Sequence, residues 1–200
     1  MTVINDPELA KHWLKMGKLL AYPTESVWGI GCDAFNEQAV HRLLTLKNRP
    51  IEKGLIVLTA DIRLIQPFLM NVVSTRRDEI VAGWKNTQTQ ATTWLFPLPN
   101  NLPTPIPRWI TGGHDNLAIR VITHPLIAHI CRTLVSDDNP YGFLVSTSCN
   151  PHGKPPATTL TQVQSYFGNH DDVVFVQGDT LGLVLPSQIR DAQTGHIIRI

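Results

Sequence analysis

The sequence has few charged residues, few cysteines and no long apolar run, and each shortage narrows the classes of protein that it can encode. Asp, Glu, Lys and Arg make up only 16% of its 200 residues, and the formal net charge is +1. Such a chain is not attracted as a whole to nucleic acid or anionic membranes, so an anion site has to be local. No stretch approaches the roughly 20 apolar residues that span a bilayer. The first residues do not resemble a signal peptide either, so we expect a cytoplasmic protein.

The three cysteines, Cys32, Cys131 and Cys149, are odd in number and far apart. This favours free thiols in a reducing compartment over a disulfide framework. Cys149 precedes Asn150, but nothing nearby indicates the electropositive setting of a reactive thiolate, so we expect a small packing residue.

Several motifs of catalytic proteins are also missing. The sequence contains no G-x-x-x-x-G-K-[ST] loop and no G-x-S-x-G elbow, which excludes a P-loop ATPase and an α/β-hydrolase. The eight histidines are scattered without metal-ligand spacing, so we predict no protein-held metal.

Apolar patterns predict helices and strands that alternate along the whole chain. Helical periodicity or capping residues indicate helices over 5–16, 36–46, 62–69, 74–82, 125–134 and 160–167. In the first of these helices, Leu9, Trp13 and Met16 fall on one face. Short apolar runs indicate strands over 18–22, 55–58, 93–96, 117–121, 143–146, 173–176 and 197–199.

Residues 84–109 are polar or proline-rich, and we interpret them as exposed loops around one strand. No composition shift marks a domain boundary. The pattern therefore predicts one α/β domain over 1–200, with helices packed on the faces of a sheet.

The segment 47–54 carries the most informative local pattern. Arg42, Lys47, Arg49 and Lys53 place four cations within twelve residues, against the single carboxylate of Glu52. Guanidinium and ammonium groups neutralise phosphate oxygens that gain charge during transfer. Cations are also common at a solvated helix end, where they interact with the helix dipole. Composition alone leaves both interpretations open.

Polar residues also follow directly after the apolar strand sequence GFLV (142–145). Ser146, Thr147, Ser148 and Asn150 could bind a phosphate, a ribose or an amino acid, because ligands of open α/β sheets sit beyond the carboxyl ends of strands. The same residue types cap ordinary turns, so this segment by itself does not decide between the two roles.

A rival interpretation comes from the glycines after Pro23. Gly29, Gly31 and Ala34 match the dinucleotide-binding pattern G-x-G-x-x-A, with Asp61 after the next strand. The match is weak, because Asp61 lies about ten residues beyond the roughly 20-residue spacing of that fingerprint.

Taken together, these segments resemble the YrdC/TsaC family of threonylcarbamoyl-AMP synthases in its short, single-domain form. The resemblance rests on four segments in family order and spacing: AYPTESVWGIGCDAFNEQAVHRLLTLKNRPIEKGLIVL (21–58), PRWITGGHDNLAIRVITHPL (107–126), LVSTSCNPHGKPP (144–156) and PSQIRDAQTGHIIR (186–199).

The resemblance implies a twisted mixed sheet flanked by helices, with one open, basic-lined cavity. It implies that threonine is held by Thr24, Arg120 and Ser187. It implies that Lys47 and Arg49 are the catalytic cations, and that ATP is held by Lys47, Arg49, Lys53, Ser146, Ser148, Asn150 and Arg199.

The implied reaction converts L-threonine, bicarbonate and ATP into threonylcarbamoyl-AMP and pyrophosphate, for modification of the adenosine next to a tRNA anticodon. ATP is a substrate, and Mg²⁺ would arrive with it because the sequence offers no dedicated carboxylate cage. The resemblance also implies transient contact with a downstream tRNA-modifying complex, and it leaves direct tRNA binding and the oligomeric state open.

Two alternatives remain. One is an RNA-binding module of the YrdC type without synthase activity; it should spread its cations over a convex face, whereas a synthase should gather them in a concavity. The other is a related carbamoyl-adenylate domain of a larger maturation enzyme, whose partner domains are missing from this sequence.

The sequence departs from the family pattern at two places. Trp84 is followed by KNTQTQAT where the family has a Trp-Pro-Gly-Pro turn, so closure of a loop over 84–92 would differ here. Cys149 stands where alanine is common, a small change in volume that we expect the fold to tolerate. We expect no counterpart in this sequence of the additional C-terminal domain of the long family form.

Overall fold

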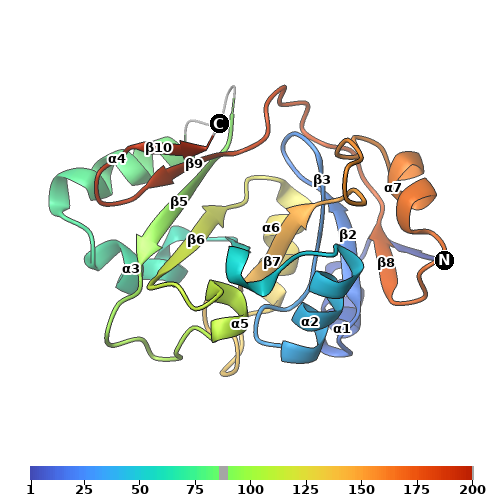
Figure 1. Ribbon diagram of the computed structural model, residues 1–200, viewed down its shortest axis with the longest axis horizontal. Coiled ribbons are helices and arrows are strands. Elements are labelled where there is room, and N and C mark those ends of the chain that lie inside the picture. The colour runs from blue at the N-terminus through green and yellow to red at the C-terminus, as the bar shows by residue number, and fades with distance from the viewer. Residues whose placement is uncertain (86–89, 200) are drawn as a thin grey trace.

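Ten strands form one mixed sheet that runs through the molecule (Figure 1). The computed structural model describes residues 1–85 and 90–199. The strand order is β1-β8-β2-β3-β7-β4-β6-β5-β9-β10, with parallel and antiparallel pairs interspersed. The strands are β1 (Thr2–Ile4), β2 (Leu19–Pro23), β3 (Trp28–Gly31), β4 (Ile56–Thr59), β5 (Thr92–Pro97), β6 (Asn116–Val121), β7 (Leu144–Ser148), β8 (Val173–Val176), β9 (Gln188–Asp191) and β10 (Ile197–Arg199).

Helices cover both faces of this sheet. The described helices are α1 (Pro7–Lys15), α2 (Glu37–Leu46), η1 (Ile51–Lys53), η2 (Ile62–Ile65), α3 (Gln66–Met70), α4 (Ser74–Lys85), α5 (Arg108–Thr111), α6 (Pro125–Thr133) and α7 (Leu160–Phe167). In the described part of the chain no helix is both long enough and apolar enough to cross a membrane.

The core consists of two hydrophobic clusters, one on each face. In β2, Leu19 and Ala21 belong to the larger cluster, whereas Leu20 and Tyr22 belong to the smaller one under α1 and α6. Because successive side chains of a strand point to opposite faces, a strand buried on both sides reads as a continuous apolar run. This is the pattern from which the strands were predicted.

The α/β class, the mixed sheet and the flanking helices are therefore confirmed, whereas several details were wrong. Three strands were missed: β1, β3 and β9. The apolar face of the first helix was misassigned, because Leu9 and Met16 are 41% and 57% exposed while Ala10 and Leu14 are fully buried. Residues 62–69 form a 3₁₀ turn followed by a short helix, and α5 begins inside the segment predicted as loops.

The dinucleotide-binding interpretation was also wrong. Gly29 and Gly31 lie within β3, antiparallel to β2 and β7, and do not form a loop that leads into a helix. Gly31 is required by packing, because a Cβ atom there would lie 1.6 Å from the carbonyl oxygen of Val145. The Asp61 carboxylate accepts hydrogen bonds from Arg63 instead of facing a ribose site.

We predict that Gly31→Ala lowers the free energy of unfolding by about 3 kcal/mol or more, since β3 and β7 must move apart. Gly83→Ala is the matched control. Gly83 lies in α4, and its added Cβ would meet Trp94 at an ordinary 3.5 Å. That change should stabilise the protein by up to about 1 kcal/mol, because alanine is the better helix former. Urea denaturation of both variants measures the difference, and equal stabilities would contradict the packing argument.

Candidate active site

A cavity of about 180 Å³ opens beside the central strands of the sheet. Its walls come from β3, β4, β6 and β7, from the connection between β2 and β3, and from both sides of the β9–β10 hairpin. The cavity is lined by Thr24, Ser26, Val27, Trp28, Gly29, Arg49, Leu55, Ile56, Leu58, Arg120, Ser146, Thr147, Ser148, Pro186, Ser187 and Arg199.

Most of the site residues expected from the sequence meet in this cavity, although they come from distant parts of the chain. The lining includes Thr24, Arg49, Arg120, Ser146, Ser148, Ser187 and Arg199. Three of the expected residues do not line it: Lys47, Lys53 and Asn150.

Lys47 lies next to the cavity wall, at the end of α2. It is only 8% exposed, so the interpretation as a solvated helix end was wrong for this residue. Its Nζ donates to the carbonyl oxygen of Ser148 at 2.6 Å and to both oxygens of Asn150. The ammonium group therefore ties the end of α2 to the residues at and just beyond the end of β7.

Burial lowers the pKa of Lys47 to about 8, and the nearby Arg49 acts in the same direction. Arg42, the fourth cation of the segment, lies elsewhere: it donates to the Gly17 carbonyl oxygen and pairs with Asp172 at 3.4 Å. The cluster of four cations seen in the sequence is thus divided by the fold, and Arg42 has a structural role.

Arg49 reaches the cavity from the turn after α2, where Asn48 has a positive φ of 44°. Its Nη2 donates to the carbonyl oxygen of Gly54 at 2.7 Å, whereas its buried Nε has no hydrogen-bond partner within the described chain. Burial and the neighbouring Arg199 lower the pKa of Arg49. An arginine that is partly desolvated, beside a second cation and with an unpaired donor, is well suited to receive an anion.

Lys53 lines an adjoining cavity of about 370 Å³. The two cavities share Arg49, Leu55, Ile56 and Arg199. The remaining wall of the second cavity is largely apolar, with polar groups at one side, and consists of Gly54, Leu95, Ile110, Thr111, His114, Asn116, Ala118, Ile189 and Ile198. A cavity with many apolar wall residues thus lies directly beside Arg49 and Arg199.

The hydroxyl segment occupies a different position from the one expected. Ser146, Thr147 and Ser148 lie within β7 rather than after it, so their side chains are held by a strand paired on both sides. Asn150 follows the strand, and its amide nitrogen donates to the Lys154 carbonyl oxygen at 2.6 Å. Cys149 is fully buried, and burial raises its pKa to about 12, which agrees with a packing role.

The three residues expected around threonine are all buried and all belong to the lining of the first cavity. Thr24, Arg120 and Ser187 are each less than 10% exposed and line it. The Thr24 hydroxyl donates to the Val27 carbonyl oxygen at 2.6 Å, and the Thr93 hydroxyl donates to Ser187 Oγ at 3.3 Å. Each of these two serine and threonine oxygens keeps lone pairs that can accept from a ligand.

Glu25 is the residue of this region that the sequence analysis missed. It is 1% exposed and forms an ion pair with Arg120. Burial lowers the pKa of Arg120 to about 10, and the nearby Tyr22 acts in the opposite direction. The Glu25 carboxylate compensates the buried charge of the guanidinium. A signal was available, because a carboxylate between Thr24 and Ser26 in a short buried segment requires a cationic partner.

The charges of the first cavity are all of one sign. Its lining holds Arg49, Arg120 and Arg199, and none of its lining residues is acidic. Within residues 1–85 and 90–199, no group of three or more His, Cys, Asp or Glu side chains could hold a metal ion. The cations therefore converge in a concave site suited to anions. The altered loop over 84–92 includes residues 86–89, which lie outside the described part of the chain.

Comparison with known proteins identifies related sequences over almost the full length. A family model for Sua5, YciO and YrdC, described as "Telomere recombination", matches residues 12–200. A threonylcarbamoyl-AMP synthase of Psychrobacter cryohalolentis is 56% identical over 95% of this chain and 94% of its own. A protein of the same name from Acinetobacter baylyi is 44% identical over the same shares of the two chains.

Solved structures share the fold. Sua5 of P. abyssi, in complex with L-threonine, matches 95% of this chain with a TM-score of 0.75 and 25% identity. This chain covers only 53% of that protein. YciO of E. coli matches 99% of this chain and 92% of its own with a TM-score of 0.74, and at 15% identity it supports the fold alone.

The buried position of Lys47 predicts a pH-dependent contribution to stability. The pKa of Lys47 is about 8 in the fold and about 10.4 in an unfolded chain. Below pH 8 the side chain is charged in both states, so the whole penalty for burying its charge lowers the stability of the fold. This penalty is relieved as the pH rises from 8 to 10.5, because the unfolded chain then binds more protons. Relative to Lys47→Met, the wild type should gain about 3 kcal/mol over that range in urea denaturation. Parallel pH curves for the two proteins would contradict the assignment.

Proposed function

The chain belongs to the Sua5/YciO/YrdC family, and from this membership we propose that it is a threonylcarbamoyl-AMP synthase. It would join L-threonine, bicarbonate and ATP into threonylcarbamoyl-AMP and release pyrophosphate. The observation that carries this proposal is the cavity itself, because three arginines and two partly free hydroxyl groups line it without a carboxylate.

The chemistry needs no protein nucleophile. The threonine amine attacks the carbon of bicarbonate, a C–N bond forms, and water leaves, which gives a carbamate. A carbamate oxygen then attacks the α-phosphorus of ATP. A new P–O bond forms, the bond to the leaving pyrophosphate breaks, and pyrophosphate departs with the electron pair. Carbamate and triphosphate are both anions, so the protein has to hold them together against their mutual repulsion. A group of cations that converge in one cavity supplies what this step requires.

We assign the two halves of the substrate to the two sides of the joined cavities. Arg49 and Arg199 lie where the cavities meet, so they would face the phosphates, with Ser146 and Ser148 beside them on β7. The apolar walls of the second cavity would take the adenine, and Lys53 would lie at its edge. Thr24, Arg120 and Ser187 would hold threonine.

Lys47 would act differently from the other cations. Its ammonium group already donates to oxygens of Ser148 and Asn150, so it would hold this wall in place and add positive charge behind it. Asn150 would act through the same contact. Mg²⁺ would enter with ATP, because the cavity offers hydroxyl groups but no carboxylate ligand, and Mg²⁺ commonly reaches such sites on substrate phosphates.

The RNA-binding alternative is less well supported. The arginines converge in a concavity, whereas a protein that reads RNA by shape uses a broad cationic face. Contact with tRNA and with a downstream tRNA-modifying complex, a cytoplasmic location, and the assignment of residues 1–200 to one domain remain proposals.

The first prediction from this function is that pyrophosphate release requires threonine, bicarbonate and ATP together. Each omission should abolish release, since the attacking group is a carbamate made from two of the three substrates. A coupled pyrophosphate assay with single omissions tests it. Release of orthophosphate, or release that is indifferent to threonine, would exclude a synthase.

The second prediction is that Arg49→Lys loses most activity while the protein remains folded. Lysine keeps the charge but not the planar fork, which here reaches both Gly54 and the cavity. The loss should correspond to about 2–4 kcal/mol of transition-state stabilisation, measured as kcat/KM. Arg63→Lys is the control, because the Arg63 side chain is 82% exposed and remote from the cavity lining. Similar turnover of both variants would remove Arg49 from the reaction.

A further inference from the structure

The Glu25 carboxylate has no part in the reaction described above, although it lies at the centre of the polar contacts around the threonine subsite. Its Oε2 pairs with Nη2 of Arg120. Its Oε1 accepts from the backbone nitrogen of Thr123 at 2.7 Å and from the Thr123 hydroxyl at 2.9 Å. Glu25 is absent from the cavity lining whereas Arg120 is part of it, so the carboxylate holds the arginine from the protein side.

The backbone of the same segment also binds the chain shortly before Ser187. Leu181 N donates to the Thr24 carbonyl oxygen at 3.1 Å, and Leu183 N donates to the Glu25 carbonyl oxygen at 2.8 Å. Ser187 itself follows four residues later and accepts a hydrogen bond from Thr93. Residues 24–25 are thus connected directly to Arg120 by an ion pair and to the segment that precedes Ser187 by backbone hydrogen bonds.

A buried arginine needs such an anchor. Its long side chain has many rotamers, and a cation without a partner is strongly unfavourable in the interior. Glu25 engages one end of the guanidinium, and the group has five N–H donors in all, so others remain for a ligand. The Arg120 Nε is among these: it is buried and has no hydrogen-bond partner within residues 1–85 and 90–199.

We propose that Glu25 is a positioning residue, which holds the Arg120 guanidinium in the orientation that receives the carboxylate of threonine. This inference rests on the proposed function and deepens it. Glu25 does not touch the substrate. It determines whether the Arg120 guanidinium is presented to the cavity in a fixed geometry or is free to turn away.

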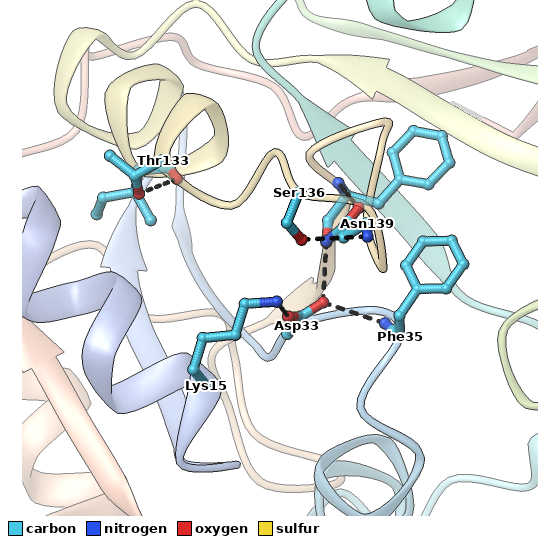
Figure 2. Close-up of polar contacts among 8 residues, drawn as sticks. Lys15, Asp33, Phe35, Thr133, Ser136 and Asn139 are labelled. Carbon is cyan, nitrogen blue, oxygen red and sulfur yellow. Dashed lines mark hydrogen bonds and ion pairs between the residues drawn. The ribbon is translucent and has the colours of Figure 1, made fainter. Parts of the chain in front are cut away.

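The chain contains a matched control for this ion pair. Asp33 is also a buried carboxylate, and it pairs with Lys15 at 2.8 Å (Figure 2). It accepts from the Phe35 backbone nitrogen at 3.1 Å and from the Asn139 side chain at 2.9 Å. Like Glu25, it therefore has a cationic partner, a backbone N–H donor and a neutral side-chain donor. None of these residues lines the candidate active site.

The test is calorimetric titration of the full chain with L-threonine, L-threoninamide and ATP separately, for the wild type, Glu25→Gln and Asp33→Asn. Both variants should lower the thermal midpoint, since each removes the charge of a buried, hydrogen-bonded carboxylate. Only Glu25→Gln should weaken threonine binding, by about tenfold or more, with ATP binding within about twofold. Threoninamide lacks the carboxylate, so its affinity should be the same for Glu25→Gln and the wild type.

Several results would overturn the inference. Unchanged threonine binding by Glu25→Gln would do so, as would equal losses in the two variants, because a purely structural role would affect both. A wild type that does not bind threonine would overturn the proposed function along with it, and this outcome is seen before any variant is compared. If Glu25→Gln does not fold, Thr123→Val removes one hydrogen bond to the same carboxylate. It should weaken threonine binding by about two- to fivefold, and no change there would also reject the proposal.

Discussion

The structure depends on the way in which buried positive charge is compensated from the protein side. Three of the cations at or near the cavity are held by oxygen atoms of the protein. Arg49 donates to the Gly54 carbonyl oxygen, Lys47 to oxygens of Ser148 and Asn150, and Arg120 pairs with Glu25. Carbonyl oxygens keep a cation in place without cancelling its charge, so the cavity keeps an excess of positive charge that an anionic ligand can neutralise.

The topology of the sheet explains why these groups can meet. β3, β7, β4 and β6 lie side by side in the sheet in this order. In the chain, however, more than 100 residues separate β3 from its neighbour β7. The close approach of β3 to β7, which Gly31 permits, brings the residues of the β2–β3 connection next to those of β7. Strand β9 of the β9–β10 hairpin pairs with β5. This pairing brings Ser187, directly before β9, and Arg199, on β10, to the cavity. A site assembled in this way cannot be read from any one segment.

Features of the fold and the site that depend on residues close together in the chain could be predicted from the sequence. Features that depend on contacts between distant residues could not. Leu43 and Leu44 of α2 lie at helical spacing and are buried as expected, because periodicity is a local property. The three missed strands are short or glycine-containing, and they become strands only through distant partners: β1 pairs with β8, β3 with β2 and β7, and β9 with β5. The roles of Thr24 and Arg120 were assigned through resemblance to a family, whereas Arg49 was selected first from the local pattern of cations. Glu25 was not selected, since its importance lies in a contact between residues 95 positions apart in the chain.

The position of Arg199 has a consequence for the dynamics of the site. It lies on β10, a three-residue edge strand whose residues are all exposed and which pairs only with β9 among the described strands. Edge elements with few buried contacts open locally at a small fraction of the global unfolding free energy. One of the three arginines is therefore carried by an element that can exchange its amide protons while the core stays closed. A phosphate ligand that binds this arginine would stabilise the hairpin by mass action, so occupancy of the site and order of the C-terminal hairpin are thermodynamically linked.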